Sequence, residues 1–301
     1  MQYFLNGVAT ALITPFTKEN KIHFEVFAQL IEYQIINHID AIVILGTTGE
    51  PSTLTRIEKR NLIKFAHKQI DGRCKLIVGT GGNNTTTVIQ DSIEAEKLGA
   101  DALLIVTPYY NKCTQAGIIE YYTSIANMVN IPIICYNVPA RTGVNILPQT
   151  MEKLATVKNI LGLKEACGNM EQICETARRI RGKCQLYSGD DYLNLPLLAI
   201  GADGIISVVS NLLPKETKDT YLYMKDAKLN EANILQDKML PIIDALFSEI
   251  NPIPAKAGMQ MLGFDVGIPR PPLTPLENIH YRQLQQALKK FGLQIVTRSQ
   301  K

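Results

Sequence analysis

The sequence predicts an α/β fold in which an eight-stranded (β/α) barrel is followed by a C-terminal helical extension. Short runs rich in valine, isoleucine and leucine alternate with longer segments of helical periodicity, which is typical of βα units around a buried parallel sheet. A Gly-Ala-Asp step enters a strand at residues 99–101 and again at 201–203, with residues 39–41 as a weaker third copy. This repetition favours a closed ring of the TIM-barrel type over an open doubly wound sheet.

Eight runs qualify as barrel strands, and they span residues 8–14, 41–45, 75–79, 102–106, 131–136, 160–164, 185–188 and 204–208. Helical periodicity fills the gaps between them, for example over residues 24–37, 56–69, 86–98, 115–128, 170–180 and 192–200. No GxGxxG follows a strand and no P-loop sequence occurs, so a nucleotide-binding protein would lack its phosphate-binding glycines. A tight βα turn explains the glycine-rich residues 79–82.

The strand pattern ends near Pro214. Helical stretches follow at residues 217–224, 232–247, 255–262 and 281–291. The proline-rich residues 267–275 cannot be helical throughout, because proline removes a backbone donor and restricts the residue before it. We therefore expect a barrel domain over residues 1–224 and a helical domain over residues 225–301, with an ordered connector inside the latter.

Composition and charge narrow the class of protein. A chain of 301 residues with 46% hydrophobic content can bury a large core. The net charge of +3 is small and the basic residues are scattered among acids, so no nucleic-acid partner is expected. The cysteines form no CxxC pair and no cluster with histidine, which favours reduced thiols over disulfides or a metal site. They are Cys74, Cys113, Cys135, Cys167, Cys174 and Cys184.

The N-terminal residues 1–7 lack the basic segment of a signal peptide, since the first basic residue is Lys18, and they lead into the first strand. No apolar run approaches the ~18 residues that would span a bilayer. We expect a cytoplasmic protein without a membrane partner.

Lys164 is the most informative residue, because it closes the apolar run at residues 160–163. An ammonium group that ends a buried strand loses hydration, which lowers its pKa and leaves part of the amine neutral. A lysine that forms a Schiff base needs this property. The alternative is a lysine whose stem packs on apolar surface while its head reaches water.

Unusual residues also follow the other strands, at residues 46–50, 107–111, 136–143 and 188–191. Each group has an ordinary explanation: a capped turn, a packing pair of tyrosines, or an aspartate that caps the next helix. Because catalytic residues of such barrels lie at the C-terminal ends of the strands, these groups would share one rim with Lys164. Together they supply an amine, hydroxyl proton carriers and a cation, which suit a carbonyl substrate that carries a carboxylate.

With these residues the chain resembles the dihydrodipicolinate synthase (4-hydroxy-tetrahydrodipicolinate synthase) family along nearly its whole length. The resemblance lies in residues 46–50, 107–111, 136–143, 162–166, 188–191 and 251–254. It implies condensation of pyruvate with L-aspartate 4-semialdehyde, early in lysine and diaminopimelate biosynthesis. It also implies that the reaction needs no metal and no organic cofactor.

The resemblance assigns the catalytic roles. Lys164 forms the imine with pyruvate, Tyr136 donates and accepts protons beside it, and Thr47 and Tyr110 relay protons to solvent. Tyr110 would reach the site across a dimer interface, within a homotetramer made of two such dimers.

The resemblance also assigns substrate binding to four further residues. Thr48 holds the pyruvate carboxylate and Arg141 the semialdehyde carboxylate, for which its planar fork is well shaped. Gly189 and Ile206 shape the pocket.

One departure from the family concerns regulation. Lysine-inhibited members carry histidines and a glutamate where this chain has Arg56, Lys59 and Thr87, although Leu54, Asn83 and Tyr109 agree with the effector site. The replacements remove a carboxylate and add two positive charges, which should repel a lysine ammonium. Weak or absent inhibition by lysine is therefore expected.

Two alternatives remain open from the sequence. Another pyruvate-dependent aldolase, such as N-acetylneuraminate lyase or a keto-deoxy sugar acid aldolase, would share Lys164 and Tyr136, although Arg141 suits a short semialdehyde carboxylate better than a polyol. A non-catalytic barrel that binds a keto acid is the alternative from a different class.

Overall fold

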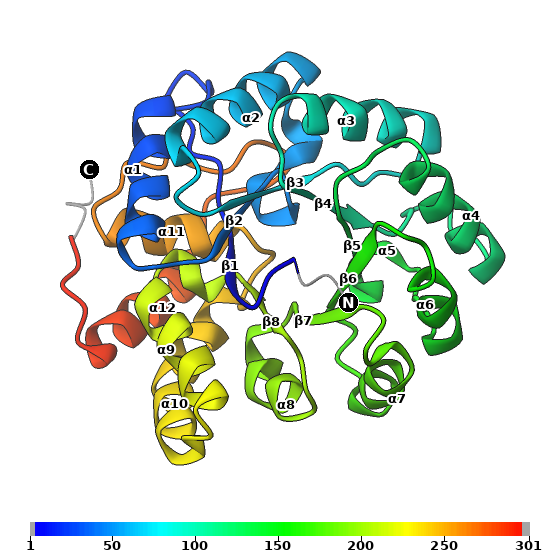
Figure 1. Ribbon diagram of the computed structural model, residues 1–301. Helices are drawn as coiled ribbons and strands as arrows, with labels where there is room; N and C mark the ends of the chain where they lie inside the picture. Colours follow the sequence, from blue (N-terminus) through cyan, green and yellow to red (C-terminus); the bar gives the residue numbers. More distant parts are fainter. Residues whose placement is uncertain (1–3, 297–301) are drawn as a thin grey trace.

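Eight parallel strands form a closed barrel in the computed structural model, which describes residues 4–296 (Figure 1). Each strand pairs with the next, and β8 closes the ring on β1. The strands are β1 Gly7–Ala11, β2 Ala41–Ile44, β3 Lys75–Gly79, β4 Ala102–Val106, β5 Ile133–Asn137, β6 Ile160–Glu165, β7 Gln185–Ser188 and β8 Gly204–Ser207. The predicted fold class is confirmed.

Helices surround the barrel in the order βα expected from the sequence (Figure 1). They are α1 Phe24–Ile36, α2 Arg56–Ile70, α3 Thr85–Lys97, α4 Gln115–Ala126, α5 Pro139–Thr142, α6 Pro148–Leu154, α7 Met170–Ile180, α8 Asn194–Ala199 and α9 Pro214–Lys225. Short 3-10 turns precede or follow several of them: η1 Thr47–Gly49, η2 Pro51–Thr53, η3 Asp191–Leu193 and η4 Val209–Asn211. The helix expected over residues 192–200 is divided between η3 and α8.

Side-chain caps explain where several helices begin. The Thr55 hydroxyl accepts from the backbone N–H of Glu58, whose carboxylate accepts from the Thr55 N–H, so α2 starts with a complete capping box. Helices α3, α4 and α7 also begin with an N-cap side chain that accepts a backbone N–H from the first turn. These N-cap residues are Asn84, Thr114 and Asn169. These helices begin within one residue of their predicted starts.

The first strand is shorter than predicted. Residues 8–14 were expected, whereas β1 ends at Ala11 and the chain then leaves the sheet. Leu12 still donates its N–H to Val43, but the Thr14 hydroxyl bonds to the backbone oxygen of Gly49 instead of continuing the ladder. Of the N-terminal residues 1–7, the first three lie outside the described residues and Gly7 opens β1.

Alternation along the strands creates two apolar layers. One set of side chains fills the barrel and includes Ala9, Val43, Leu104, Tyr136 and Ile206. The other set packs between the strands and the helices. The inner layer closes the barrel below its C-terminal mouth, so a ligand can enter only from that end.

The C-terminal extension consists of α10 Leu229–Leu246, α11 Ile253–Met261 and α12 Asn278–Phe291. Helix α10 packs against α9 and α12, and α11 packs against α12 and η4 (Figure 1). The connector at residues 267–275 was expected not to be helical throughout, and the structure shows no helix in it. Just before it, the backbone oxygen of Val266 accepts a hydrogen bond from the Phe16 N–H. At Gly267 a Cβ would lie 2.0 Å from the Phe16 oxygen, so only glycine allows this approach.

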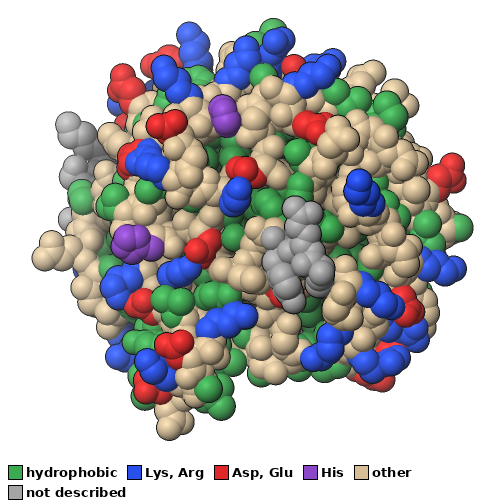
Figure 2. Space-filling model, in the orientation of Figure 1, with side chains coloured by type: hydrophobic (Ala, Val, Ile, Leu, Met, Phe, Trp, Pro, Cys, Tyr) green, Lys and Arg blue, Asp and Glu red, His purple; other side chains and the backbone are tan. Residues whose placement is uncertain are grey.

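Basic and acidic side chains are interspersed on the surface seen in Figure 2, in keeping with the small net charge. Among residues 4–296, no helix combines the length and apolar character needed to cross a membrane. The six cysteines are free thiols in the described chain, with Cys135 and Cys184 buried and Cys174 exposed.

Candidate active site

The strand ends enclose a cavity of about 250 Å³ at the C-terminal mouth of the barrel. Its polar lining comes from Thr47, Thr48, Tyr136, Arg141, Lys164, Asp190, Tyr192 and Asn251. A second cavity of about 360 Å³ adjoins it and shares Thr47, Tyr136 and Arg141. The residues predicted at the ends of strands β2, β5, β6 and β7 therefore meet in one place.

Lys164 lies near the end of β6, paired in register with Tyr136 of β5 and Tyr187 of β7. Only 4% of the residue is exposed. Burial lowers its pKa to about 8; the Asp191 carboxylate opposes this shift, and the Arg141 guanidinium adds to it. About a tenth of the amine is thus neutral at pH 7, far more than for an ordinary lysine, and able to attack a carbonyl carbon.

Gly189 leaves room for the lysine side chain. A Cβ at this position would lie 2.8 Å from both Cγ and Cε of Lys164, which is closer than carbon atoms can approach. The Gly189 N–H donates to the backbone oxygen of Glu165, so the glycine cannot move away without breaking the link between β6 and β7. Gly189 therefore fixes the path of the Lys164 stem toward the cavity.

Tyr136 lies directly beside the amine, with Lys164 Nζ 4.4 Å from the centre of its ring. Burial raises the pKa of Tyr136 to about 12, while Arg141 and the Thr47 side chain favour the phenolate and reduce the shift. The phenol consequently holds its proton at neutral pH. It can donate that proton to a developing oxyanion and recover it afterwards.

Thr47 and Thr48 belong to η1, which follows β2 and is closed by a hydrogen bond from the Gly49 N–H to the Gly46 oxygen. Thr48 is buried, and its Oγ1 accepts a hydrogen bond from Nδ2 of Asn251 at 2.9 Å. Because the acceptor side of this hydroxyl is occupied, its own proton is available for an anionic ligand.

Arg141 projects from the short helix α5 after β5. Its Nη2 donates to the backbone oxygen of Asn251 at 3.3 Å. Asn251 therefore contacts both a threonine and an arginine of the cavity, although it comes from the C-terminal extension. The sequence reasoning did not assign Asn251 to the site; the only available signal was its place in the resembling residues 251–254.

Comparison with known proteins assigns the chain to a family. The sequence profile described as the Dihydrodipicolinate synthetase family matches residues 4–291. The chain belongs to this family.

Similar proteins cover nearly the whole chain. The 4-hydroxy-tetrahydrodipicolinate synthase of Alkaliphilus oremlandii is 45% identical over 95% of this chain and 99% of its own length. The crystal structure of dihydrodipicolinate synthase from Aquifex aeolicus superposes with a TM-score of 0.95 at 40% identity, covering 97% of this chain and 100% of that one. The chloride-inhibited enzyme from Acinetobacter baumannii, solved with pyruvate, has a TM-score of 0.93 at 38% identity over 95% and 99% of the two chains.

The similar proteins, which are named as 4-hydroxy-tetrahydrodipicolinate or dihydrodipicolinate synthases, decide between the alternatives that the sequence left open. They confirm that the chain is an enzyme of the synthase type. The N-acetylneuraminate lyase, sugar-acid aldolase and non-catalytic alternatives are set aside.

Two residues expected at the site of this family member lie apart from the cavity in a single chain. Tyr110 is 91% exposed and has a φ of 71°, an uncommon conformation for a residue with a bulky side chain. Ile206 packs in the inner apolar layer, and Val208 lines the cavity at the end of the same strand. Asp190, Tyr192 and Phe247 also line it and were not singled out as site residues.

The residues that depart from the lysine-inhibited pattern cluster on α2 and α3. Arg56 and Lys59 line a small cavity together with Asp91 and Glu94. Arg56 pairs with Glu94 at 3.4 Å, and Thr87 stands in the first turn of α3. The cavity thus holds three basic side chains, Arg56, Lys59 and Arg60, against two acidic ones, Asp91 and Glu94, which leaves an excess of positive charge.

One group of possible metal ligands lies elsewhere, at the start of α12. Glu249, Glu277 and His280 bring a ligand atom each to within 4.8 Å of one another. His280 Nδ1 is already 2.7 Å from Glu249 Oε1, which also accepts the Glu277 N–H. These contacts tie His280 and the Glu277 backbone to Glu249, and the group does not line the cavity.

Proposed function

We propose that this synthase condenses pyruvate with L-aspartate 4-semialdehyde, to give 4-hydroxy-tetrahydrodipicolinate, through a Schiff base on Lys164. The observation that carries the proposal is a buried amine with a pKa of about 8 next to a tyrosine that stays protonated. The family of the chain and the pyruvate complex of the Acinetobacter baumannii relative support the choice of substrates. The product belongs to lysine and diaminopimelate biosynthesis.

The neutral Lys164 amine attacks the keto carbon of pyruvate, and loss of water gives the iminium ion. The iminium withdraws electrons, so that the methyl carbon loses a proton and becomes an enamine nucleophile. This carbon then attacks the aldehyde carbon of the second substrate. Tyr136 is placed to move protons at the imine, and the Thr47 hydroxyl passes them on.

The two substrate carboxylates are assigned to two different donors. The Thr48 hydroxyl, held by Asn251, binds the pyruvate carboxylate. The Arg141 guanidinium, held by the Asn251 backbone, binds the semialdehyde carboxylate. Gly189 and Ile206 shape the pocket, the first at its wall and the second in the layer beneath it.

Tyr110 completes the proton relay in a partner subunit. Tyr110 is exposed and its backbone lies in the strained left-handed region, which supports a role in contact with a second chain. We propose a homotetramer built from two tight dimers, with each dimer exchanging this residue. The protein acts in the cytoplasm, without a metal or organic cofactor, and its domains divide at residues 224 and 225.

The test is consumption of pyruvate and aspartate semialdehyde by the purified protein, with Lys164→Ala as the control. Borohydride added in the presence of pyruvate should fix a three-carbon adduct on Lys164, detectable by intact mass and peptide mapping. An absence of both turnover and adduct in folded wild-type protein would refute the proposal.

A further inference from the structure

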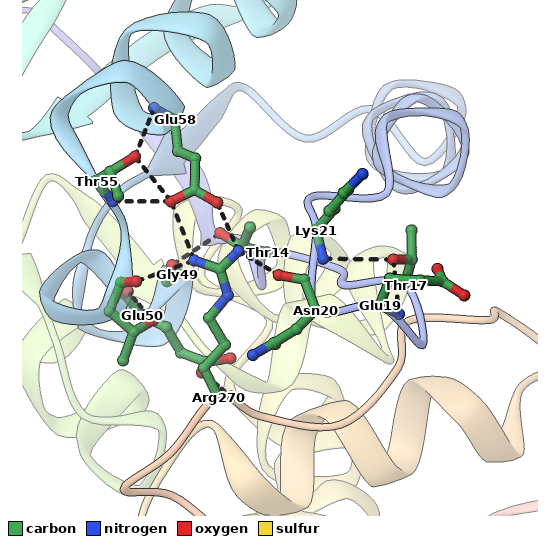
Figure 3. A network of polar contacts seen from close by, with 11 residues as sticks. Thr14, Thr17, Glu19, Asn20, Lys21, Gly49, Glu50, Thr55, Glu58 and Arg270 are labelled. Atoms are coloured by element: carbon green, nitrogen blue, oxygen red, sulfur yellow. Dashed lines mark hydrogen bonds and ion pairs between the residues drawn. The ribbon is translucent and has the colours of Figure 1, made fainter.

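Behind the Thr47–Thr48 turn lies a buried cluster of charges that the mechanism above does not use. Its central residue is Glu50, which ends η1 with a φ of 55°. Figure 3 shows Arg270 between Glu50 and Glu58, with Asn20 approaching from the N-terminal loop. The cluster thus joins the turn after β2 to the connector of the C-terminal extension.

The Glu50 carboxylate is bound from two directions. Oε1 forms an ion pair with Nζ of Lys256 in α11 at 2.5 Å, and both side chains are only 1% exposed. Oε2 accepts the backbone N–H of Arg270 at 2.8 Å. The Lys256 ammonium also lies 3.9 Å above the ring of Phe16. A carboxylate so deeply buried is retained only if such partners compensate its lost hydration.

Arg270 extends the same cluster to the next turn. Its guanidinium donates to the backbone oxygens of Thr53 and Asn20 and to both carboxylate oxygens of Glu58. Two acids, Glu50 and Glu58, are therefore balanced by two bases, Lys256 and Arg270. The described contacts leave the cluster neutral as a whole and fixed at several points.

Glu50 connects this cluster to the catalytic threonines through the backbone. Its N–H donates to the Thr47 oxygen at 3.2 Å, and its own oxygen accepts from Thr53. The Thr14 hydroxyl holds the Gly49 oxygen at 2.8 Å. A rotation of the Glu50 peptide would therefore shift the Thr47–Thr48 turn directly.

We propose that Glu50 is a positioning residue, which Lys256 and Arg270 of the C-terminal extension hold so that Thr47 and Thr48 face pyruvate. The proposal rests on the function proposed above for the two threonines. It makes α11 and the connector part of the pyruvate site, although neither touches the substrate. The strained backbone of Glu50 is maintained by the ion pair on its side chain.

The decisive variant is Glu50→Gln, which preserves side-chain shape and an oxygen acceptor for the Arg270 N–H but removes the negative charge. The Lys256 ammonium then has no counter-ion. The Thr47–Thr48 turn loses the ion pair that anchors it to α11 through Glu50. We expect the KM for pyruvate to rise between ~10-fold and ~100-fold, the range that small misplacements of binding groups produce. Lys164 should still be trapped completely by borohydride at saturating pyruvate.

A matched control comes from the opposite end of the barrel. Lys218→Met removes the cation from the partly buried pair between Lys218 and Asp40, which lies before β2 and not at the mouth. This variant should lower the thermal midpoint as a lost ion pair does, yet leave the KM for pyruvate within about two-fold of the wild type, because distant sites act independently. If Glu50 had only a structural role, Glu50→Gln would likewise lower the thermal midpoint and leave the KM for pyruvate within about two-fold of the wild type.

Each outcome decides the proposal. Should Glu50→Gln fail to fold, the double variant with Lys256→Met removes both charges and avoids an isolated buried ion, and its KM for pyruvate is expected to stay raised. A folded variant with wild-type KM overturns the positioning role. If borohydride traps no pyruvate adduct on Lys164 of the wild type, the proposed function itself is refuted. Failure of the positioning role and failure of the proposed function therefore give different results.

Discussion

Replacing Lys164 by methionine should abolish catalysis and make the fold more stable. Methionine has a similar length and no charge, so it fills the space between Gly189 and Tyr136 without a group that must be hydrated. The wild-type lysine has a pKa of about 8 in the folded protein and an ordinary value of 10.5. Its protonated form is therefore disfavoured by the fold, and this cost is present at every pH below about 8.

The size of the effect follows from the two pKa values. At 1.36 kcal/mol per pKa unit, the difference between 10.5 and about 8 destabilises the folded state by about 3 kcal/mol at pH 7. The cost diminishes as the pH rises from 8 to 10.5, because the folded amine is then neutral and the free energy of removing the proton from the unfolded chain falls toward zero at its own pKa. For 301 residues, about 3 kcal/mol corresponds to a rise of roughly 5 °C in Tm.

The destabilisation by Lys164 and its dependence on pH are measured by thermal unfolding of the wild type and Lys164→Met at pH 7 and pH 10. The variant should melt higher at pH 7, and the difference in Tm should narrow to roughly a quarter at pH 10. Lys256→Met is the control, since that lysine also has a pKa of about 8 but is paired with Glu50. Its loss leaves a buried carboxylate unpaired and should destabilise by about 3–5 kcal/mol. A Lys164→Met variant less stable than the wild type at pH 7 would show that the reasoning is wrong.

Three other changes test individual residues. Gly189→Ala places a Cβ against the Lys164 stem, so the rate of borohydride trapping with pyruvate should fall about 10-fold or more. An unchanged trapping rate would show that the lysine side chain can move aside. Tyr110→Phe should lower turnover and leave Lys164 trappable; equal turnover would remove Tyr110 from the relay. L-lysine should inhibit poorly because Arg56 and Lys59 repel its ammonium, and an inhibition constant well below millimolar in initial-rate assays would contradict this.

Local patterns were sufficient to predict the barrel and the position of its lysine. Strands buried on both faces read as continuous apolar runs, so Lys164 at the end of residues 160–163 stood out against its neighbours. The helix starts near residues 56 and 86 were predicted from periodicity alone, and the structure adds Thr55 and Asn84 as the residues that cap them. The short helices α5 and α6 were not named, because four and seven residues give too little periodicity to recognise.

Contacts between distant parts of the chain could not be predicted from local sequence patterns. Asn251 reaches Thr48 across 203 positions, and Arg270 reaches Glu50 across 220. Neither pair has a local signal, since asparagine near proline reads as a turn and arginine between prolines as an exposed connector. The exposure of Tyr110 agrees with the expectation that it acts across a dimer interface, but that expectation came from the family resemblance and not from any local pattern.

The dependence of the Thr47–Thr48 turn on Lys256 and Arg270 has a consequence for biosynthesis of the protein itself. All eight strands have left the ribosome before the partners of Glu50 have been translated, because β8 ends at Ser207. The nascent barrel must therefore carry a carboxylate without its counter-ion at the very turn that later holds pyruvate. Water can solvate this group until α11 docks, so the turn that holds pyruvate gains its full set of supports only after residues 256 and 270 have been translated.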